Sequence, residues 1–546
     1  MQSFKLLKHY YFISMSPFSF FSSVHISDRI EAFREAEKHL FEFAKTRFAH
    51  HQEEESNHHF ELFDTPIQIP SVIKEGTAAA SCQLHDNATD AESNYSLHGV
   101  KVINKRLSEN DPAEAPSTAT TTSSTTPAPL VLLHGYANGS LYFYRNLMGL
   151  SHHFGSIYAL DMLGWGLSSR PKFDLLTADD DTIKNNDRIN INDDDDKVSI
   201  ETKQKVTSAE SFFVESLESW RQHHNLPKMT LAGHSMGGYL SVAYAERYPQ
   251  HVERLILISP VGVPERQEED DSKISTLPFY FRYMIKMSRY LFNRGTTPGS
   301  FLRSLPFSRS KKMVDGYILN RLPAITCPEE RKHLSEYLYQ NSMLPGSGEC
   351  CLNEILTAGA FAKIPLVNRI PDIKTDNGEG MEVHMVYGQR DWMDFRGGLE
   401  VQRLSYKKRV EWERDQEQLK QERKQQSDTT ANTNSSSPPP RIFVHGVQDA
   451  SHLLMLDNSQ GFNAALIIAS GGEAKMPPNM PLPVEFVCDE FAQSASYESR
   501  SMRDVIGEEG AAEFFRGPRW NRGRKQEGQE ADTGSLEEKK VEEQLA

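Results

Sequence analysis

Apolar residues along the chain fall into short continuous runs that alternate with longer, periodic ones. The short runs are bounded by turn-forming residues and lie at 129–133, 157–161, 228–232, 252–258, 383–387 and 442–444. Such runs predict buried strands of a parallel sheet. The clearest periodic run, 239–248, ends at a proline and predicts a helix between two of these strands. The alternation predicts an α/β fold with helices flanking the sheet.

One strand-to-helix junction holds the sequence Gly-His-Ser-Met-Gly, at residues 233–237. A serine in a sharp turn between a strand and a helix needs small residues two positions away on either side, because a Cβ there would collide with neighbouring backbone. Gly233 and Gly237 meet that need. The turn places the Ser235 hydroxyl at a helix N-terminus, where backbone N–H groups stabilise an oxyanion. We therefore predict that Ser235 is a nucleophile held in a nucleophile elbow.

A second glycine-containing loop follows the strand predicted at 129–133, in the sequence His134-Gly135-Tyr136. In folds with a nucleophile elbow, a loop of this kind supplies one of the two oxyanion-hole donors. We assign the donors to the backbone N–H groups of Met236 and Tyr136.

A nucleophilic serine also needs a base and a carboxylate that orients the base. Asp391 and Asp394 follow the strand predicted at 383–387, at the carboxyl end where open α/β sheets place their active sites. The strand-Gly-x-x-Asp spacing favours Asp391, and Asp394 stays the alternative. His452 lies in the loop after the last core strand and is the predicted base. His445, at the end of that strand, is interpreted as structural.

Several motifs resemble signatures of one α/β-hydrolase subfamily. They are His452-x4-Asp457 and the segments 164–171, 260–266 and 387–394. The subfamily includes the cardiolipin deacylases of fungi, the N-acyl phosphatidylethanolamine lipases, and the lipid-droplet lipase coactivator of animals. The resemblance covers roughly 28–463, apart from three insertions. It implies the α/β-hydrolase fold, a mostly parallel sheet flanked by helices, with an inserted helical lid and disordered insertions.

The resemblance also implies a chemistry. It points to phospholipase- or lysophospholipase-type deacylation of acyl lipids through an acyl-serine, with lysophosphatidic acid acyltransferase activity as an addition. The coactivator branch has asparagine at the nucleophile position, whereas this chain has Ser235. The lipase branch favours the acid matching Asp394, so both acids stay open. We expect a single acyl-enzyme, formed with the help of His452, that reacts either with water or with a lysolipid hydroxyl. Asp457 is therefore interpreted as a structural residue and not as a second catalytic acid.

The sequence leaves two other function classes as alternatives. One is a non-enzymatic lipase coactivator at lipid droplets, which the resemblance suggests and the intact Ser235 disfavours. The other is a soluble esterase or peptidase of the same fold that acts on small polar substrates.

The 546 residues allow one large α/β domain with appendages. We expect a targeting or membrane-anchoring segment (1–27), an N-terminal helix, strand region and disordered linker (28–128), the first half of the core (129–265), a lid (266–380), the second half of the core (381–472) and a mostly disordered tail (473–546). Disorder is expected at 87–126, 174–205 and 427–440. Mixed charges without an apolar stripe predict a solvated helix at 400–424, inside a charged insertion at 400–440.

The predicted lid is basic on a chain whose formal net charge is −15. Between 273 and 312 there is no acid, and the cations are Lys273, Arg282, Lys286, Arg289, Arg294, Arg303, Arg309, Lys311 and Lys312. Aromatic residues are interleaved with them. This mixture suits an anionic membrane interface, and it equally suits a cap whose aromatic rings line an acyl pocket.

Composition limits the binding partners, cofactors and cellular locations that are expected for the chain. The negative charge argues against nucleic-acid binding. The chain contains no run of 18 apolar residues, so we expect no membrane-spanning helix. Five cysteines without metal-type spacing indicate a reducing compartment, and we expect no metal or other cofactor. Residues 1–27 fit either a mitochondrial targeting segment or an aromatic membrane anchor. We expect an intracellular peripheral membrane protein, at the mitochondrion, in the cytoplasm or on lipid droplets; protein partners are not predicted.

Overall fold

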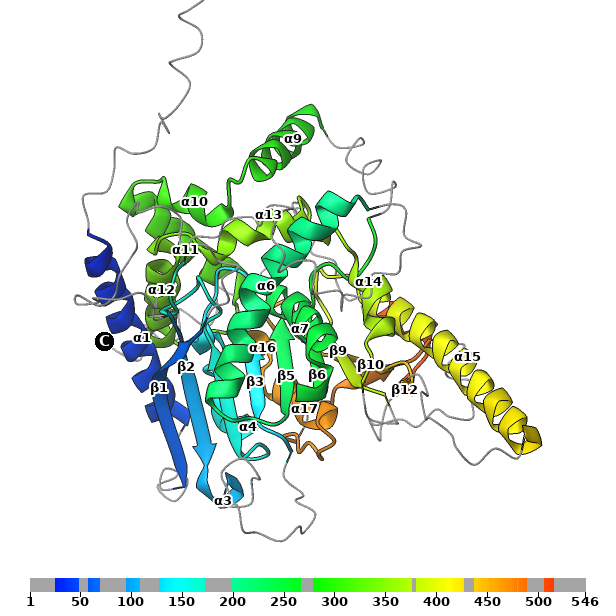
Figure 1. The fold of residues 1–546 in the computed structure, drawn as a ribbon. Helices are drawn as coiled ribbons and strands as arrows, with labels where there is room; N and C mark the ends of the chain where they lie inside the picture. Colours follow the sequence, from blue (N-terminus) through cyan, green and yellow to red (C-terminus); the bar gives the residue numbers. More distant parts are fainter. Residues whose placement is uncertain are drawn as a thin grey trace, which may run out of the picture.

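A twisted sheet forms the centre of the molecule (Figure 1). The structure, a computed structural model, describes residues 25–48, 57–68, 95–108, 127–171, 198–266, 278–375, 380–426, 437–478, 480–488 and 505–514. Within these residues the sheet has ten strands in the order β1-β2-β4-β3-β5-β6-β9-β10-β11-β12.

The strands are β1 (His58–Ile67), β2 (Tyr95–Asn104), β3 (Leu130–Leu133), β4 (Ser156–Leu160), β5 (Met229–His234), β6 (Val252–Ile258), β9 (Glu382–Gly388), β10 (Arg441–Val447), β11 (Val484–Phe486) and β12 (Val505–Ile506). The strands from β4 to β10 pair in parallel, and antiparallel pairs flank them on both sides. β7 (Leu356–Thr357) and β8 (Phe361–Ala362) form a separate hairpin. The predicted α/β-hydrolase fold is confirmed.

Each face of the sheet buries its own hydrophobic cluster. Successive residues of β3 point to opposite faces, so Val131 and Leu133 join one cluster while Leu130 and Leu132 join the other. The first cluster is covered by α6 (Ile200–His223), α7 (Met236–Arg247), α14 (Leu366–Arg369) and the start of α15 (Arg396–Gln426). The second is covered by α1 (Ile26–Phe48), α4 (Leu147–Ser151), α16 (Leu454–Asp457) and α17 (Ser459–Ala469). Two closed cores hold the strand ends in fixed positions.

Helices fill the segment between β6 and β9, where the lid is predicted. They are α9 (Phe279–Asn293), α10 (Pro298–Arg303), α11 (Phe307–Arg321), α12 (Pro328–Met343) and α13 (Leu352–Ile355). In Figure 1, α9, α10 and α13 lie above the sheet, α12 lies beside α1, and α9 stands furthest from the body. Among the residues that the structure describes, no helix combines the length and the apolarity that crossing a membrane would require.

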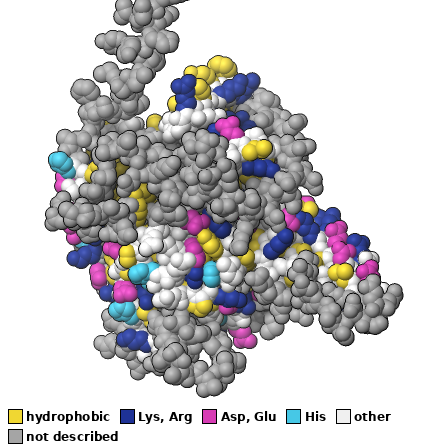
Figure 2. All heavy atoms as spheres, in the orientation of Figure 1, with side chains coloured by type: hydrophobic (Ala, Val, Ile, Leu, Met, Phe, Trp, Pro, Cys, Tyr) yellow, Lys and Arg dark blue, Asp and Glu magenta, His cyan; other side chains and the backbone are white. Residues whose placement is uncertain are grey.

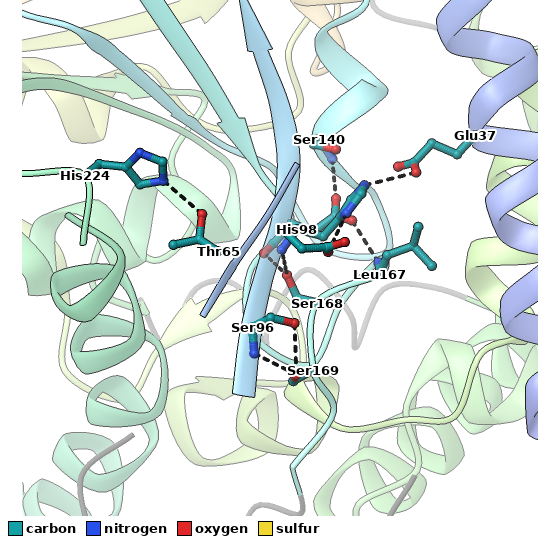
Figure 3. A network of polar contacts seen from close by, with 11 residues as sticks. Glu37, Thr65, Ser96, His98, Ser140, Leu167, Ser168, Ser169 and His224 are labelled. Carbon is teal, nitrogen blue, oxygen red and sulfur yellow. Dashed lines mark hydrogen bonds and ion pairs between the residues drawn. The ribbon is translucent and has the colours of Figure 1, made fainter. Parts of the chain in front are cut away.

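A buried ionic network fastens α1 to the edge of the sheet (Figure 3). His98 on β2 places Nε2 3.0 Å from Glu37 Oε2 and Nδ1 2.9 Å from Asp64 Oδ1. Burial alone would lower the pKa of His98, but the two carboxylates outweigh burial and hold that pKa well above its ordinary value. Burial raises the pKa of Glu37. The network ties the N-terminal helix to β1 and β2.

The prediction of disorder at 87–126 is wrong for its central part. Tyr95–Asn104 forms β2, followed by the short helix α3 (Lys105–Ser108). β2 pairs with both β1 and β4, and Leu97, Val100 and Val102 are buried. The sequence signal is weak because polar stretches surround this strand and its stabilisation comes from distant partners. The remainder, 87–94 and 109–126, lies outside the described residues.

The other predicted disordered segments are corrected in part. Residues 200–205 form the start of α6, and the Ser199 hydroxyl caps the helix by accepting from the Thr202 N–H at 3.2 Å. The tail predicted to be mostly disordered supplies β11, β12 and α19 (Glu508–Phe514), and Phe514 packs on Phe486 with ring centroids 5.1 Å apart. Residues 1–24, 174–197 and 427–436 lie outside the described residues.

The charged helix predicted at 400–424 is present as α15, but its first turns are not solvated. Val401, Gln402 and Ser405 are buried against β10. The Gln402 amide donates to the Ile442 carbonyl at 3.0 Å and accepts from the Cys488 N–H at 2.8 Å. The later turns are exposed, as their charge pattern predicts.

Candidate active site

Ser235 lies at the junction of β5 and α7, in strained backbone. Its φ is 53° and its ψ is −112°, a conformation that few residues other than glycine adopt. A Cβ on Gly233 would lie 2.2 Å from the Gly237 carbonyl oxygen, and one on Gly237 would lie 2.5 Å from the Leu133 carbonyl oxygen. The close approach of β5, α7 and β3 therefore requires glycine at both positions. This packing forms the predicted elbow.

His452 lies between Ser235 and Asp391. Its Nε2 is 3.2 Å from Ser235 Oγ, and its Nδ1 is 3.1 Å from Asp391 Oδ1. Because a carboxylate only accepts, Nδ1 carries the proton and Nε2 is left to accept from the serine hydroxyl. The three side chains come from the loops after β5, β9 and β10. They form the nucleophile, base and acid arrangement that a serine hydrolase needs.

The Asp391 carboxylate is fully buried and held from three sides. Oδ1 also accepts from the Met393 N–H at 2.9 Å, and Oδ2 accepts from the Ser259 hydroxyl. Burial would raise the pKa of Asp391, but the His452 imidazole and the hydrogen bonds from Ser259 and Met393 outweigh it, so the pKa lies below its ordinary value. The acid is thereby kept ionised next to the imidazole.

The alternative acid, Asp394, occupies a different environment on the same loop. Its carboxylate is 39% exposed and accepts from the Arg396 guanidinium, whose Nε lies 2.9 Å away. It also accepts from the Arg396 N–H at 3.0 Å, so it caps the start of α15. Of the two predicted acids, the structure brings Asp391 to His452 and turns Asp394 toward solvent.

His445 is buried on β10, away from the nucleophile. Its Nε2 lies 3.0 Å from His384 Nδ1 on β9, and the two rings stack with centroids 5.3 Å apart. This pairing agrees with its interpretation as a structural histidine.

Two side chains that the sequence reasoning did not single out support the base. His234 Nε2 donates to the His452 carbonyl at 2.9 Å, and the two rings lie with centroids 4.8 Å apart. Burial and the neighbouring His452 lower the pKa of His234 to about 3, so its ring stays neutral. The single N–H of the neutral ring is then on Nε2, where it donates to the His452 carbonyl. Ser259, the residue after β6, supports Asp391 as described above. His234 stands at a variable position of the elbow motif and Ser259 belongs to none, so neither carried a signal of its own.

The loop after β3 lies directly against the nucleophile. A Cβ on Gly135 would be 3.1 Å from Ser235 Cβ and 2.7 Å from His234 Nδ1. His134 anchors this loop to the segment after β4, because its Nε2 accepts from the Met162 N–H at 3.1 Å. The backbone of Tyr136 follows Gly135, while Met236 begins α7 immediately after Ser235. Both predicted oxyanion donors thus belong to segments that border Ser235.

The side chain of Tyr136 extends from this loop to the lid. Its hydroxyl accepts from the Gly299 N–H at 3.2 Å, and its ring packs edge-on against Trp165 with centroids 5.2 Å apart. The segment 164–171 therefore packs against the loop beside Ser235 through Trp165. One residue links the loop beside the nucleophile to helix α10.

Asp457 shapes the loop that carries His452. Its Oδ2 accepts from the Ser451 N–H at 2.8 Å and also from the Ser451 hydroxyl. Burial raises the pKa of this carboxyl. The contacts closest to Asp457 are thus with the residue before His452, which agrees with a structural interpretation of the His-x4-Asp motif.

Among the described residues, one group of side chains has the spacing of metal ligands. Ligand atoms of Glu37, His98 and Asp161 lie within 4.8 Å of one another. His98 bridges two carboxylates, and the Asp161 oxygens accept from the N–H groups of Ser140 at 2.6 Å and Leu167 at 2.8 Å (Figure 3). Hydrogen bonds within the protein therefore already engage this group, and we interpret it as an ionic network.

Comparison with known proteins places the chain among hydrolase-fold proteins. The model of the alpha/beta hydrolase fold family matches residues 128–400. A probable 1-acylglycerol-3-phosphate O-acyltransferase of Oryza sativa subsp. japonica is 29% identical over 311 residues, which are 56% of this chain and 66% of that protein. The 1-acylglycerol-3-phosphate O-acyltransferase of Arabidopsis thaliana is 31% identical over 281 residues, 50% of this chain and 58% of that protein. The chain thus spans less than two thirds of the length of these two relatives.

A third relative is matched over more of its length. The 1-acylglycerol-3-phosphate O-acyltransferase ABHD5 of Mus musculus is 30% identical over 290 residues, 52% of this chain and 69% of that protein. Among solved structures, the carboxylesterase CesB from Bacillus subtilis is 14% identical, with a TM-score of 0.38, and the match covers 80% of this chain and 97% of that chain.

Proposed function

Because the chain belongs to the α/β-hydrolase fold family, we propose that it is a serine hydrolase of acyl lipids that works through an acyl-serine intermediate. The observation that carries the proposal is the position of His452, within hydrogen-bonding distance of both Ser235 and Asp391. Identity to proteins named acyltransferases supports an acyl group as the part that is transferred.

In the proposed reaction, Ser235 Oγ attacks the carbonyl carbon of an acyl ester. His452 Nε2 takes the serine proton, and Asp391 stabilises the imidazolium that forms. The tetrahedral intermediate collapses as His452 returns the proton to the leaving alcohol oxygen, which leaves the acyl group on Ser235. Water then attacks the acyl-serine with His452 as base, and the fatty acid leaves.

Negative charge develops on the former carbonyl oxygen in both tetrahedral intermediates. We assign its stabilisation to the N–H groups of Met236 and Tyr136, which border Ser235 on two sides. A single donor of this kind contributes roughly 3–4 kcal/mol to the transition state. The neighbouring Gly233, Gly237 and Gly135 let the backbone approach closely enough for this.

We propose that transfer to lysophosphatidic acid, where it occurs, uses the same acyl-serine. A lysolipid hydroxyl then takes the place of water as the attacking group, and His452 removes its proton in the same way. Asp457 is engaged by Ser451, which supports one shared site in preference to a second acid for acyl transfer. Hydrolysis and transfer are thus two fates of one intermediate.

Acyl lipids reside in membranes and lipid droplets, so we propose that the protein works peripherally at such a surface, inside the cell. The targeting or anchoring segment is predicted at 1–27, and residues 1–24 of it lie outside the described residues. The proposal therefore rests on the substrate and on the lid.

Incubation of the purified chain with phospholipid, with and without lysophosphatidic acid, tests this function. We expect fatty acid release in the first case and a new diacyl product in the second. Ser235→Ala should abolish both while its melting temperature stays close to that of the wild type. Acyl transfer that survives in Ser235→Ala would contradict the shared intermediate, and equal fatty acid release by both proteins would contradict hydrolysis through Ser235. No release by the folded wild type would favour a lipase coactivator.

A further inference from the structure

Helix α9 carries large apolar side chains on its solvent-facing side. They recur at intervals of four, four and three residues, which places them on one face of the helix: Phe279, Tyr283, Met287 and Tyr290. Their exposed fractions are 81%, 53%, 38% and 52%. Figure 2 shows hydrophobic and basic side chains gathered together over α9 at the top of the molecule. A continuous exposed apolar face of this kind is typical of an interaction surface.

The opposite side of α9 accounts for its attachment to the protein. Phe292 packs against the hydrophobic cluster that also holds α6 and α7, and Ile285, two turns earlier, is half-buried. The helix is therefore apolar on two sides. The inner side serves the fold, and the outer side is left for a partner.

The flank of the exposed face is positively charged. Arg282 and Lys286 are exposed and lie one turn apart next to the apolar stripe, and the Arg294 guanidinium lies 4.9 Å from the centroid of the Tyr290 ring. No acidic residue occurs between 273 and 312, although the whole chain carries a net charge of −15. This local reversal of charge complements an anionic partner and disfavours a neutral one.

We propose that α9 docks the protein onto an anionic phospholipid surface. Its aromatic rings would lie at the level of the headgroups while Arg282 and Lys286 contact lipid phosphates. The inference rests on the proposed function for its substrate, since an acyl phospholipid is both the surface and the molecule consumed. The hydrogen bond from the Gly299 N–H to the Tyr136 hydroxyl connects the segment after α9 with the loop beside Ser235. Docking through α9 therefore brings the site close to the lipid.

Vesicle flotation of the full chain tests the docking surface. The Ser235→Ala protein is mixed with vesicles of phosphatidylcholine alone or of phosphatidylcholine with phosphatidylglycerol, so that no hydrolysis is measured. We expect binding to the mixed vesicles, weak binding to phosphatidylcholine alone, and loss of binding as salt is raised. Arg282→Gln with Lys286→Gln should weaken binding about 30-fold, since each cation near the surface contributes on the order of 1 kcal/mol. Tyr283→Ser with Met287→Ser should also weaken it.

Matched control substitutions remove the same charge from α15, where acids surround the cations. Arg414→Gln with Lys420→Gln should leave vesicle binding unchanged, and thermal melting checks that every variant is folded. Wild-type-like binding by folded α9 variants would overturn the proposal, and so would a failure of the parent protein to bind anionic vesicles. Binding to phosphatidylcholine alone that equals binding to the mixed vesicles and does not change with salt would overturn the assignment of an anionic partner. Because activity is not measured here, each of these results is independent of the proposed catalysis.

Discussion

The Nδ1 atom of His452 lies 3.1 Å from Asp391 Oδ1, although the two residues are 61 positions apart in the chain. This contact fixes the imidazole in the tautomer whose Nε2 accepts from Ser235. Asp391→Asn should therefore lower turnover of a soluble ester about 10⁴-fold and leave the fold intact, because an amide favours the wrong tautomer. Steady-state kinetics and a melting curve measure the two effects.

Asp394→Asn is the matched control for that substitution, three residues away on the same loop. It removes a carboxylate that caps α15 and pairs with Arg396, so we expect a stability loss of about 1 kcal/mol and little change in rate. The reverse pattern, with Asp394→Asn inactive and Asp391→Asn active, would show that the triad acid is Asp394.

Ser259 is expected to be a positioning residue for the acid. Ser259→Ala removes the hydroxyl that donates to Asp391 Oδ2, and a hydrogen bond to a charged group contributes about 1.5–3 kcal/mol. We predict a fall in kcat of roughly tenfold or more with KM nearly unchanged, since the hydroxyl contacts Asp391 and not the substrate. A rise in KM at constant kcat would assign Ser259 to substrate binding instead.

The loop beside the nucleophile should not tolerate a Cβ at Gly135. In Gly135→Ala the new atom would lie 2.7 Å from His234 Nδ1, so the loop that carries the Tyr136 N–H must shift. We expect a loss of kcat of roughly a hundredfold, in the range seen when one oxyanion donor is lost. Gly316→Ala on α11 has nothing within 4 Å of the added Cβ and should keep full activity. Equal activities of the two variants would argue against the assigned oxyanion loop.

The ionic network around His98 predicts a stability change with pH. Glu37 and Asp64 hold the folded-state pKa of His98 well above the ordinary 6.5, so the stabilisation is full below 6.5 and is lost as pH rises through the folded-state pKa. Urea unfolding at several pH values should show the free energy of unfolding of the wild type falling above about pH 6.5, and His98→Gln should flatten that fall. Parallel curves for the two proteins would contradict the assignment.

Local patterns predicted the centre of this molecule well and its edges poorly. The parallel strands are short apolar runs and the elbow is a local motif, so both can be predicted from neighbouring residues in the sequence. Asp391 and Asp394 share one loop, and their orientations depend on where Ser259 and Arg396 lie. Strand β2 and the base of α15 are stabilised by partners far away in the sequence, which is why a polar composition misled the prediction there. His234 and Ser259 act on the triad from positions that no motif marks.

Every step of the proposed reaction requires Ser235 to be an activated nucleophile. Reaction of the folded chain with a fluorophosphonate probe, followed by mass spectrometry of its peptides, tests this most directly. We expect covalent modification of Ser235, strongly slowed labelling in His452→Ala, and none in Ser235→Ala. An unlabelled Ser235 in correctly folded wild-type protein, or labelling that is equally fast in His452→Ala, would contradict it.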